Sequence, residues 1–504
     1  PPRSTQGVSS AASDVYKRQV YVHIDCERGT AQELSDYFTF RVPGFQYMPA
    51  FRNKMWDGNI RLFTLATSLI YAGLVEYIKQ FAQERKYTVV EREKEIDVAN
   101  NPEIADFLKR FDPKSQGKLL TVRDYQQDGF LRAIKGRRCV LVSPTASGKS
   151  LIIYMIVCFL LHPPRPAICP KEKKILIVVP TTNLVEQMYG DFKDYGMPVE
   201  KYCQRIYEGQ SRILSKRVVI STWQSIYKQT RKFFDPFYCV IGDEAHGFKS
   251  RSLTAIMTKL ESCPYRIGTT GTLDDSSIHQ LVLEGLFGPV HKITSTKELM
   301  EKEALATLTI TCLELKYQKE DCKAARELKY HEELEFIVGH LKRNQVIQNL
   351  CLKLEGNTLV LFKLVDKHGK NLYKLISEKA GKNRKVFFIY GKTAVEDRES
   401  IRSITEKQKN AIIVASYGTF STGVNIRNLH NIVFASPSKS RIRTLQSIGR
   451  GLRITEEKTF AQLYDIVDNL EIGRHKNYTL NHFLERLKLY NEEQFDYTIH
   501  NIDL

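Results

Sequence analysis

A loop that ends in Gly-Lys-Ser follows the first long apolar run of the sequence. The run Cys139-Val-Leu-Val leads into Ser143-Pro-Thr-Ala-Ser-Gly-Lys-Ser150, and a helical pattern begins directly after it. Backbone N–H groups at a helix N-terminus, with the positive end of the helix dipole, bind phosphate. Lys149 is then placed to reach the β- and γ-phosphates of a nucleotide, and Ser150 to hold Mg²⁺. Ser143 stands where the usual phosphate-loop pattern has Gly, so an ordinary strand–helix turn is the alternative for this segment alone.

Two adjacent carboxylates end another apolar run. Tyr238-Cys-Val-Ile is followed by Gly242 and then by Asp243-Glu-Ala-His246. A carboxylate at the carboxyl end of a parallel strand lies where open α/β sheets bind ligands. Asp243 is therefore a candidate Mg²⁺ ligand, and Glu244 a candidate for orienting or deprotonating a water molecule. Four such residues occur by chance in many proteins, but these lie downstream of a phosphate loop.

A basic segment near the C-terminus adds cations without carboxylates. From Lys439 to Arg453 there are five Lys or Arg residues and no acidic ones. The spacing of three predicts that Arg450 and Arg453 share a helical face, where arginines from a second lobe can stabilise transition-state charge on a γ-phosphate. A salt-bridged pair is the alternative. Lys439, Arg441 and Arg443 are left as candidate contacts to a nucleic-acid backbone.

Aromatic residues alternate with cations in a patch close to the N-terminus. Between Phe45 and Arg61 the patch includes Arg52, Lys54 and Trp56. Such side chains can stack on bases and pair with phosphates. An ordinary core with cationic neighbours is the alternative, and patch composition alone favours it.

Apolar runs alternating with helical patterns form two series that must position these groups. Continuous apolar runs between helices indicate parallel sheets covered on both faces. The sequence therefore predicts two tandem α/β lobes after a small α/β unit, with a charged, mostly helical segment from 297 to 350 joining the lobes. The runs begin at Cys139, Ile175, Val218, Tyr238, Leu359, Val386, Ala411 and Ile432.

Composition excludes several classes of protein. With 42% hydrophobic and 26% charged residues, the chain is neither largely disordered nor membrane-spanning. Its longest apolar run, Leu151 to Leu161, predicts a buried helix instead. Ten cysteines, no two closer than ten positions, fit neither a zinc ribbon nor a disulfide framework and favour the reducing cytoplasm.

The net charge of +18 indicates a polyanionic partner, and the distribution of the charge along the chain indicates which residues bind it. Residues 20–112 hold twelve basic and fourteen acidic residues, so the positive excess lies in residues 113–504.

Taken in order, these motifs resemble those of superfamily 2 helicases. The resemblance spans residues 123–453 and implies two RecA-like lobes that use ATP and Mg²⁺, with Lys149, Asp243, Glu244, Arg450 and Arg453 carrying hydrolysis. The matching segments are Arg123-Asp-Tyr-Gln126, Ser143–Ser150, Pro180-Thr-Thr, Ser221-Thr-Trp-Gln, Asp243–His246, Thr270-Gly-Thr, Ser416–Val424 and Gln446–Arg453.

The family's other roles carry over to matching positions. Gln126 would read the adenine edge, and Thr270 and Thr272 would couple the nucleotide state to lobe movement. Thr181, Thr222 and Thr419 would contact the nucleic-acid backbone. The nucleotide would be bound by Arg123, Gln126, Pro144, Thr145, Ala146, Ser147, Gly148, Lys149, Ser150, Gly423 and Gln446, with Mg²⁺ on Ser150 and Asp243.

A closer resemblance is to the phage UvsW-type helicases. It rests on Trp56-Asp-Gly-Asn-Ile-Arg-Leu62, Val414–Gly423 and the small leading domain. It implies an ATP-driven motor on branched DNA (forks, junctions and RNA–DNA hybrids) in recombination, repair and replication, working in the host cytoplasm if phage-encoded. It also implies that the leading domain contacts duplex DNA, and the candidate contacts there are Arg52, Lys54, Trp56 and Arg61. We expect the chain to be a monomer. An RNA helicase, a restriction-type translocase subunit and a DNA-annealing module without ATPase activity remain the alternatives.

These expectations divide the chain into five parts. Residues 1–19 are expected to be a disordered leader that does not look native, and residues 20–112 a small DNA-binding domain. Residues 113–290 and 291–470 are expected to be the two helicase lobes, and residues 471–504 a helical tail that packs on the second lobe.

Overall fold

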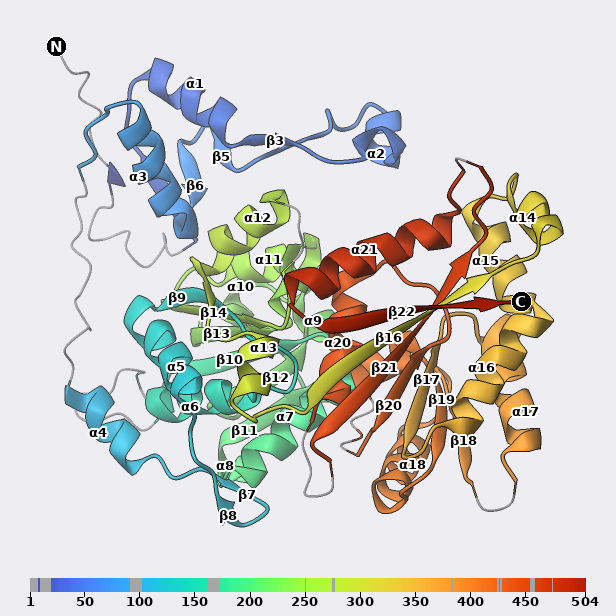
Figure 1. Ribbon diagram of the computed structural model, residues 1–504. Helices are drawn as coiled ribbons and strands as arrows, with labels where there is room; N and C mark the ends of the chain where they lie inside the picture. The colour runs from blue at the N-terminus through green and yellow to red at the C-terminus, as the bar shows by residue number, and fades with distance from the viewer. Residues whose placement is uncertain are drawn as a thin grey trace. The chain divides into compact units, whose positions relative to one another are not determined.

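The computed structural model describes residues 8–9, 20–90, 102–161, 170, 172–249, 251–273, 277–381, 384–423, 426, 428–453, 458–473 and 475–504. These residues fold into two compact units, each built on a seven-stranded sheet, and the first unit also holds the leading domain (Figure 1). The two predicted α/β lobes are thereby confirmed. Within the described ranges, no helix combines the length and apolar character needed to cross a membrane.

The leading domain is a small sheet covered by two helices. Its strands lie in the order β1-β2-β6-β5, and side chains such as Leu34, Phe38 and Phe81 form its core. Most of the expected disordered leader lies outside the described residues, but Val8 and Ser9 form β1 and pair with β2. The elements are β1 (Val8–Ser9), β2 (Tyr21–Ile24), α1 (Arg28–Tyr37), β3 (Thr39–Arg41), η2 (Phe45–Tyr47), α2 (Pro49–Arg52), β4 (Asn59–Arg61), β5 (Phe63–Thr64), β6 (Leu69–Tyr71), η3 (Ala72–Leu74) and α3 (Val75–Glu84).

Two glycines bring the leading domain against helix α12 of the first unit. A Cβ on Gly73 would lie 1.8 Å from the carbonyl oxygen of Glu284, and one on Gly285 would lie 2.9 Å from Cβ of Tyr71. Only residues without a side chain allow the two backbones to approach this closely. The leading domain is therefore packed directly on the helix that follows strand β14.

The first sheet is parallel throughout and runs β11-β12-β10-β13-β14-β9-β15. Its central helix α6 is buried along nearly its whole length, which confirms the helix predicted at Leu151–Leu161. The strands are β9 (Arg138–Val142), β10 (Lys174–Val179), β11 (Cys203–Ile206), β12 (Val218–Thr222), β13 (Phe237–Asp243), β14 (Tyr265–Thr270) and β15 (Val290–Lys292). Around them lie α4 (Pro102–Arg110), the hairpin β7 (Lys114–Ser115) and β8 (Lys118–Leu119), α5 (Asp124–Gly136), α6 (Lys149–Leu161), α7 (Thr182–Asp194), α8 (Val199–Tyr202), α9 (Trp223–Ile226), α10 (Arg231–Phe234), η4 (Ala245–Lys249), α11 (Arg251–Lys259) and α12 (Ser277–Phe287).

The second sheet is also parallel and runs β18-β19-β17-β20-β21-β16-β22. The strands are β16 (Thr307–Lys316), β17 (Thr358–Phe362), β18 (Val386–Ile389), β19 (Ile412–Ser416), β20 (Asn431–Phe434), β21 (Phe460–Asn469) and β22 (Asp496–Asp503). The helices are α13 (Thr296–Glu301), α14 (Lys319–Ala325), α15 (Tyr330–Gly339), α16 (Leu341–Lys353), η5 (Val365–Gly369), α17 (Lys370–Lys379), α18 (Val395–Lys407), α19 (Tyr417–Gly423), α20 (Arg441–Gly451) and α21 (Tyr478–Glu492).

Two expectations about the second unit are wrong in part. The segment expected to be a mostly helical joint contains β16, a ten-residue strand paired on both sides. The tail expected to be helical contains α21 but ends in β22, which pairs with β16 along eight residues. Alternating Thr, Leu and Ile in β16 is a strand pattern that neighbouring charged residues hide, and β22 is a largely exposed edge strand with little apolar signal.

The tail is an integral part of the second unit. Arg486 of α21 makes two 2.8 Å contacts with the carboxylate of Asp465 in β21, and the Tyr490 hydroxyl donates to the same carboxylate at 2.9 Å. All three side chains are buried. The expectation that the tail packs on the second lobe is therefore supported by a buried ion pair.

Candidate nucleotide and nucleic-acid site

The predicted phosphate loop joins β9 to α6 at the carboxyl edge of the first sheet. Ala146 and Gly148 have φ angles of 69° and 83°, the left-handed backbone that turns successive N–H groups in one direction. The Lys149 ammonium donates to the carbonyl oxygen of Ser143 at 3.0 Å. This contact keeps Lys149 at the loop, where a phosphate oxygen can take the place of the carbonyl.

Gln126 lies against the glycine of this loop. A Cβ on Gly148 would lie 2.5 Å from Nε2 of Gln126, so the close approach requires glycine there. Oε1 of Gln126 accepts the backbone N–H of Arg123 at 3.0 Å, which fixes the buried amide at the start of α5. The structure thus brings together three predicted nucleotide-binding residues that lie up to 25 positions apart in the sequence.

Asp243 is the last residue of β13 and is held by its neighbour strand. Thr269 of β14 donates its hydroxyl to Oδ1 of Asp243 at 2.8 Å. Burial, and then the adjacent Glu244 carboxylate, raise the pKa of Asp243 to about 6, while the Lys149 ammonium opposes that rise. A carboxylate whose charge is so poorly compensated gains most from a bound cation, so the donor set fits a divalent metal.

The second predicted Mg²⁺ ligand has a partner that the sequence did not suggest. Oγ of Ser150 and Oη of Tyr195 are 2.8 Å apart, and the Tyr195 carbonyl accepts the Tyr154 hydroxyl at 3.3 Å. Tyr195 follows α7 and lies 45 residues from Ser150, too far for any local pattern to connect them. The phenol orients the Ser150 hydroxyl beside the phosphate loop.

Glu244 connects to β14 through a histidine. Its backbone is left-handed, with φ of 52°, a strained conformation for a non-glycine residue that is common at active sites. Nδ1 of His246 lies 3.3 Å from Oε2 of Glu244 and 3.1 Å from Oγ1 of Thr270, whose hydroxyl is also 2.8 Å from the carbonyl of Thr272. Hydrogen bonds therefore link Thr272 to Thr270 and Thr270 to His246, and the His246 ring lies in close contact with the Glu244 carboxylate.

The predicted arginines lie at the end of α20 in the second unit. Gln446 and Arg450 belong to the helix, and the guanidinium of Arg450 lies 5.8 Å from the ring centre of Phe420. Helix α20 ends at Gly451, so Arg453 follows it and the expected shared helical face is wrong. Two glycines in the last three residues of α20, positions 449 and 451, weaken the helix there. Gly423 ends α19, and Val424 of the same motif lies outside the described residues.

Two of the three threonines predicted to contact nucleic acid are buried, and the third, Thr181, is partly exposed. Thr222 and Thr419 are only 5% and 6% exposed, and their hydroxyls lie 2.9 Å and 2.8 Å from those of Ser225 and Ser416. Oγ1 of Thr181 is buried without a hydrogen-bond partner among the described residues. Thr181 is thus the threonine whose hydroxyl has capacity left for a ligand.

The predicted basic contacts differ in how freely their charges can act. Arg441 forms ion pairs with Glu492 and, at 3.8 Å, with Glu493, so part of its charge is compensated within the second unit. Lys439 and Arg443 are exposed. In the leading domain, Arg52 and Lys54 are exposed as well, whereas Arg61 pairs with Asp57 at 2.5 Å and the indole N–H of Trp56 donates to the Asn59 carbonyl at 2.7 Å.

Known protein families match three stretches of the chain. Residues 15–91 match the N-terminal domain of DNA helicase UvsW, residues 119–275 the res subunit of type III restriction enzymes, and residues 341–455 the helicase conserved C-terminal domain. The ATP-dependent DNA helicase uvsW of Enterobacteria phage T4 is 34% identical over 503 residues, 96% of this chain and 98% of that protein. The chain belongs to the UvsW family of superfamily 2 helicases. The predicted resemblance and fold class are confirmed.

Other relatives place this UvsW-family chain in a wider group. The DNA 3'-5' translocase XPB2 of Sulfurisphaera tokodaii is 25% identical over 433 residues, 77% of this chain and 89% of that protein. The crystal structure of T4 UvsW matches with a TM-score of 0.50 at 32% identity, covering 96% and 98% of the two chains. A fragment of a putative HsdR subunit of a type I restriction enzyme from Vibrio vulnificus YJ016 has a TM-score of 0.57 at 16% identity, covering 92% and 83%, which shows a shared fold.

Proposed function

We propose that this chain is an ATP-dependent DNA helicase that unwinds or remodels branched DNA: forks, junctions and RNA–DNA hybrids. The observation that carries the proposal is the carboxyl edge of the first sheet, where the phosphate loop, Gln126 and the Asp243–Glu244 pair meet in a chain of the UvsW family. In that family setting, these groups serve ATP hydrolysis that drives movement along DNA.

The proposal gives each residue of this edge, and the two arginines of the second unit, a part in hydrolysis. Gln126 and Arg123 bind the base, the loop N–H groups and Lys149 bind the β- and γ-phosphates, and Ser150 and Asp243 hold Mg²⁺. The metal, when bound, neutralises charge on the phosphates. Glu244 orients the attacking water and accepts its proton, and Arg450 and Arg453 stabilise the charge of the transition state.

Directed movement requires that the affinity for a DNA strand differ between nucleotide states. The close contact of Glu244 with His246 and the hydrogen bond between His246 and Thr270 give the carboxylate pair a physical connection to β14. Helix α12 follows β14 along the chain and carries the leading domain. Lys439, Arg443 and Thr181 are the proposed contacts to the strand in the two units.

We further propose a monomer that acts in the cytoplasm, which is that of the host cell if the chain is phage-encoded. All nine cysteines in the described part of the chain are free thiols, as expected in a reducing compartment. Sedimentation of the full chain with and without DNA checks the oligomeric state.

A panel of DNA structures tests the proposed function. Unwinding and ATP hydrolysis are measured side by side on forks, four-way junctions, RNA–DNA hybrids, linear duplex DNA and duplex RNA, with Lys149→Ala as the control variant. We expect ATP-dependent unwinding of branched DNA, and a fall in hydrolysis on the order of 10³-fold in Lys149→Ala with DNA binding retained.

The panel also separates the alternatives. Stronger stimulation by duplex RNA than by branched DNA would make the chain an RNA helicase, and movement on linear duplex without unwinding would make it a restriction-type translocase. Annealing of strands without any DNA-stimulated ATP hydrolysis would leave only a DNA-structure-binding module.

A further inference from the structure

Strands β3 and β4 form a hairpin with a folded tip, called here the arm (residues 39–61; Figure 1). The rings of Phe45 and Phe51 meet edge to face, with centres 4.6 Å apart. The Arg41 guanidinium lies 4.2 Å from the centre of the Phe45 ring on which it stacks, and Phe45 packs closely against Gly58. The tip is therefore an ordered platform with its own small aromatic core.

The arm is basic although the leading domain as a whole is not. Residues 39–61 contain four Arg or Lys residues and one acidic residue, whereas residues 20–112 contain more acidic than basic residues. That one carboxylate, Asp57, accepts hydrogen bonds from Arg61 at 2.5 Å and from the Asn59 amide at 3.0 Å, which hold its pKa well below the ordinary value. With Asp57 compensated by Arg61, the charges of Arg41, Arg52 and Lys54 remain to attract a polyanion.

A surface hollow of about 630 Å³ opens on the arm between its cations and its single tryptophan. The hydrogen bond from Trp56 Nε1 to the Asn59 carbonyl, 2.7 Å, fixes the plane of the indole. Met55 is 74% exposed beside it, and Tyr47 on the same tip is 71% exposed. The residues that line the hollow are Phe51, Arg52, Lys54, Met55, Trp56 and Asp57.

Apolar side chains this exposed on a basic platform indicate a binding surface. A flat apolar face next to a phosphate group is the feature that distinguishes an unpaired nucleotide from duplex DNA, whose base faces are covered by stacking. Aromatic rings that bind single strands stack on such faces, and nearby cations pair with the phosphates.

We propose that the hollow takes an unpaired nucleobase at a DNA branch point, stacked on Trp56 and Met55, with its phosphates beside Arg52 and Lys54. The arm thereby recognises the branch itself, while Lys439, Arg443 and Thr181 contact the strand along which the motor moves. This inference rests on the proposed function, because it assumes branched DNA as the substrate.

The chain contains only two tryptophans, Trp56 and Trp223, which allows a direct test. In the full-length Trp223→Phe background, the emission of Trp56 is recorded while a fork with unpaired arms is added without ATP. A blunt duplex of equal length is the control DNA, and anisotropy of labelled DNA gives the fraction bound. We expect the fork to quench Trp56 strongly at saturation and the blunt duplex to leave its emission unchanged.

Exposed positions provide variants that do not disturb the tip. At these positions, Met55→Ala and Lys54→Gln should each weaken fork binding several-fold. Trp56 is half-buried and hydrogen-bonded within the arm, so Trp56→Phe is used there and should weaken fork binding less than Met55→Ala does, with blunt-duplex affinity unaltered in all three variants. Unchanged Trp56 emission at saturating fork, equal quenching by the blunt duplex, or equal loss of affinity for both DNAs would overturn the proposal.

The two proposals fail in different ways. Loss of the Trp56 signal together with normal DNA-stimulated ATP hydrolysis overturns the base site and leaves the helicase assignment intact. Quenching by the fork, together with no DNA-stimulated ATP hydrolysis by the wild-type chain, supports the base site and overturns the helicase assignment.

Discussion

The sheet of β9–β15 and the sheet of β16–β22 have the same topology but use their carboxyl edges differently. Numbered along the chain, the strands of both sheets lie in the order third, fourth, second, fifth, sixth, first, seventh. Ser143, at the start of the phosphate loop, directly follows β9, and Tyr317 directly follows the equivalent strand β16. Buried side chains occupy the carboxyl edge of the second sheet, where the first sheet has its candidate nucleotide site; Asp468 lies in β21, the counterpart of β14, one strand along from the counterpart of β13 and Asp243.

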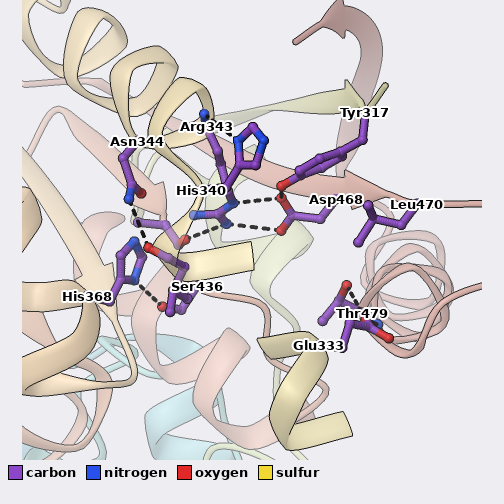
Figure 2. A network of polar contacts seen from close by, with 12 residues as sticks. Tyr317, Glu333, His340, Arg343, Asn344, His368, Ser436, Asp468, Leu470 and Thr479 are labelled. Atoms are coloured by element: carbon purple, nitrogen blue, oxygen red, sulfur yellow. Dashed lines mark hydrogen bonds and ion pairs between the residues drawn. The ribbon is translucent and has the colours of Figure 1, made fainter. Parts of the chain in front are cut away.

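Figure 2 shows this filled edge as a buried polar network. Nε and Nη2 of Arg343, from α16, contact the two carboxylate oxygens of Asp468 in β21 at 2.6 Å and 3.0 Å. Nη2 also donates to the carbonyl of Ala435 at 2.8 Å, and the Tyr317 hydroxyl donates to Asp468 at 2.8 Å. Nδ1 of His368 lies 2.9 Å from the hydroxyl of Ser436, just past β20.

The two edges differ in the source of the cation that compensates the buried carboxylate. Asp243 in the first sheet has a raised pKa and is open to an external cation, whereas Asp468 has a guanidinium supplied by its own chain. Because Asp468 is already paired and buried, we do not expect it to bind Mg²⁺ as proposed for Asp243.

Arg343→Met removes the cation that fills the edge of the second sheet, and it should have the largest effect on stability. Both partners of the Arg343–Asp468 pair are fully buried, so the variant leaves an unpaired charge in the second unit. We expect a loss of about 3–5 kcal/mol, seen as faster hydrogen exchange in β21. The double variant Arg343→Met with Asp468→Leu should recover most of the loss. Equal exchange rates in the single variant and the wild type would show that the ion pair is dispensable.

The stability of the second unit should also depend on pH, because this unit buries a lysine. Lys458 is 1% exposed and donates to the Gly451 carbonyl at the end of α20; burial, and then Arg453, lower its pKa to about 7. Between pH 7 and about 10 the unfolded chain holds a proton on this lysine that the folded chain lacks, so stability rises with pH.

Lys458 adds at most about 1.4 kcal/mol per pH unit to the rise of the free energy of unfolding with pH, and Lys458→Met should lose this contribution. Hydrogen exchange in β21, corrected for the intrinsic effect of pH on exchange, is compared at pH 7.5 and 8.5. The same slope in both proteins would contradict the assignment.

A smaller effect is expected where the tail joins the second unit. The buried carboxylate of Glu333 accepts the backbone N–H groups of Tyr478 and Thr479 at 2.9 Å and 2.8 Å, at the start of α21. Glu333→Gln removes the negative charge from this helix N-terminus and should cost about 1 kcal/mol, measured by hydrogen exchange in α21. Glu335→Gln, which breaks an exposed ion pair with Lys367, is the matched control and should have little effect.

The sequence predicted what local patterns encode. Contiguous segments form the phosphate loop, the Asp243–Glu244 pair and most inner strands. Their local sequence is therefore enough to predict their structure. Tyr195 beside Ser150 and Arg343 beside Asp468 are pairs 45 and 125 residues apart, and only the fold brings them together. Strand β16 was missed because Thr alternates with apolar residues in a charged region, and the pairing that stabilises it comes from β21 and β22, far along the chain.

One pair of variants tests the central claim most directly: Asp243→Asn and Asp468→Asn, the same change at the equivalent edges of the two sheets. ATP hydrolysis and urea unfolding are measured for both. We expect Asp243→Asn to lose hydrolysis by at least about 100-fold while keeping or raising stability, because its carboxylate is held with a raised pKa. Asp468→Asn should unfold at lower urea yet hydrolyse ATP within about twofold of the wild-type rate while folded. Loss of hydrolysis without loss of stability in Asp468→Asn, or normal hydrolysis in Asp243→Asn, would contradict the account.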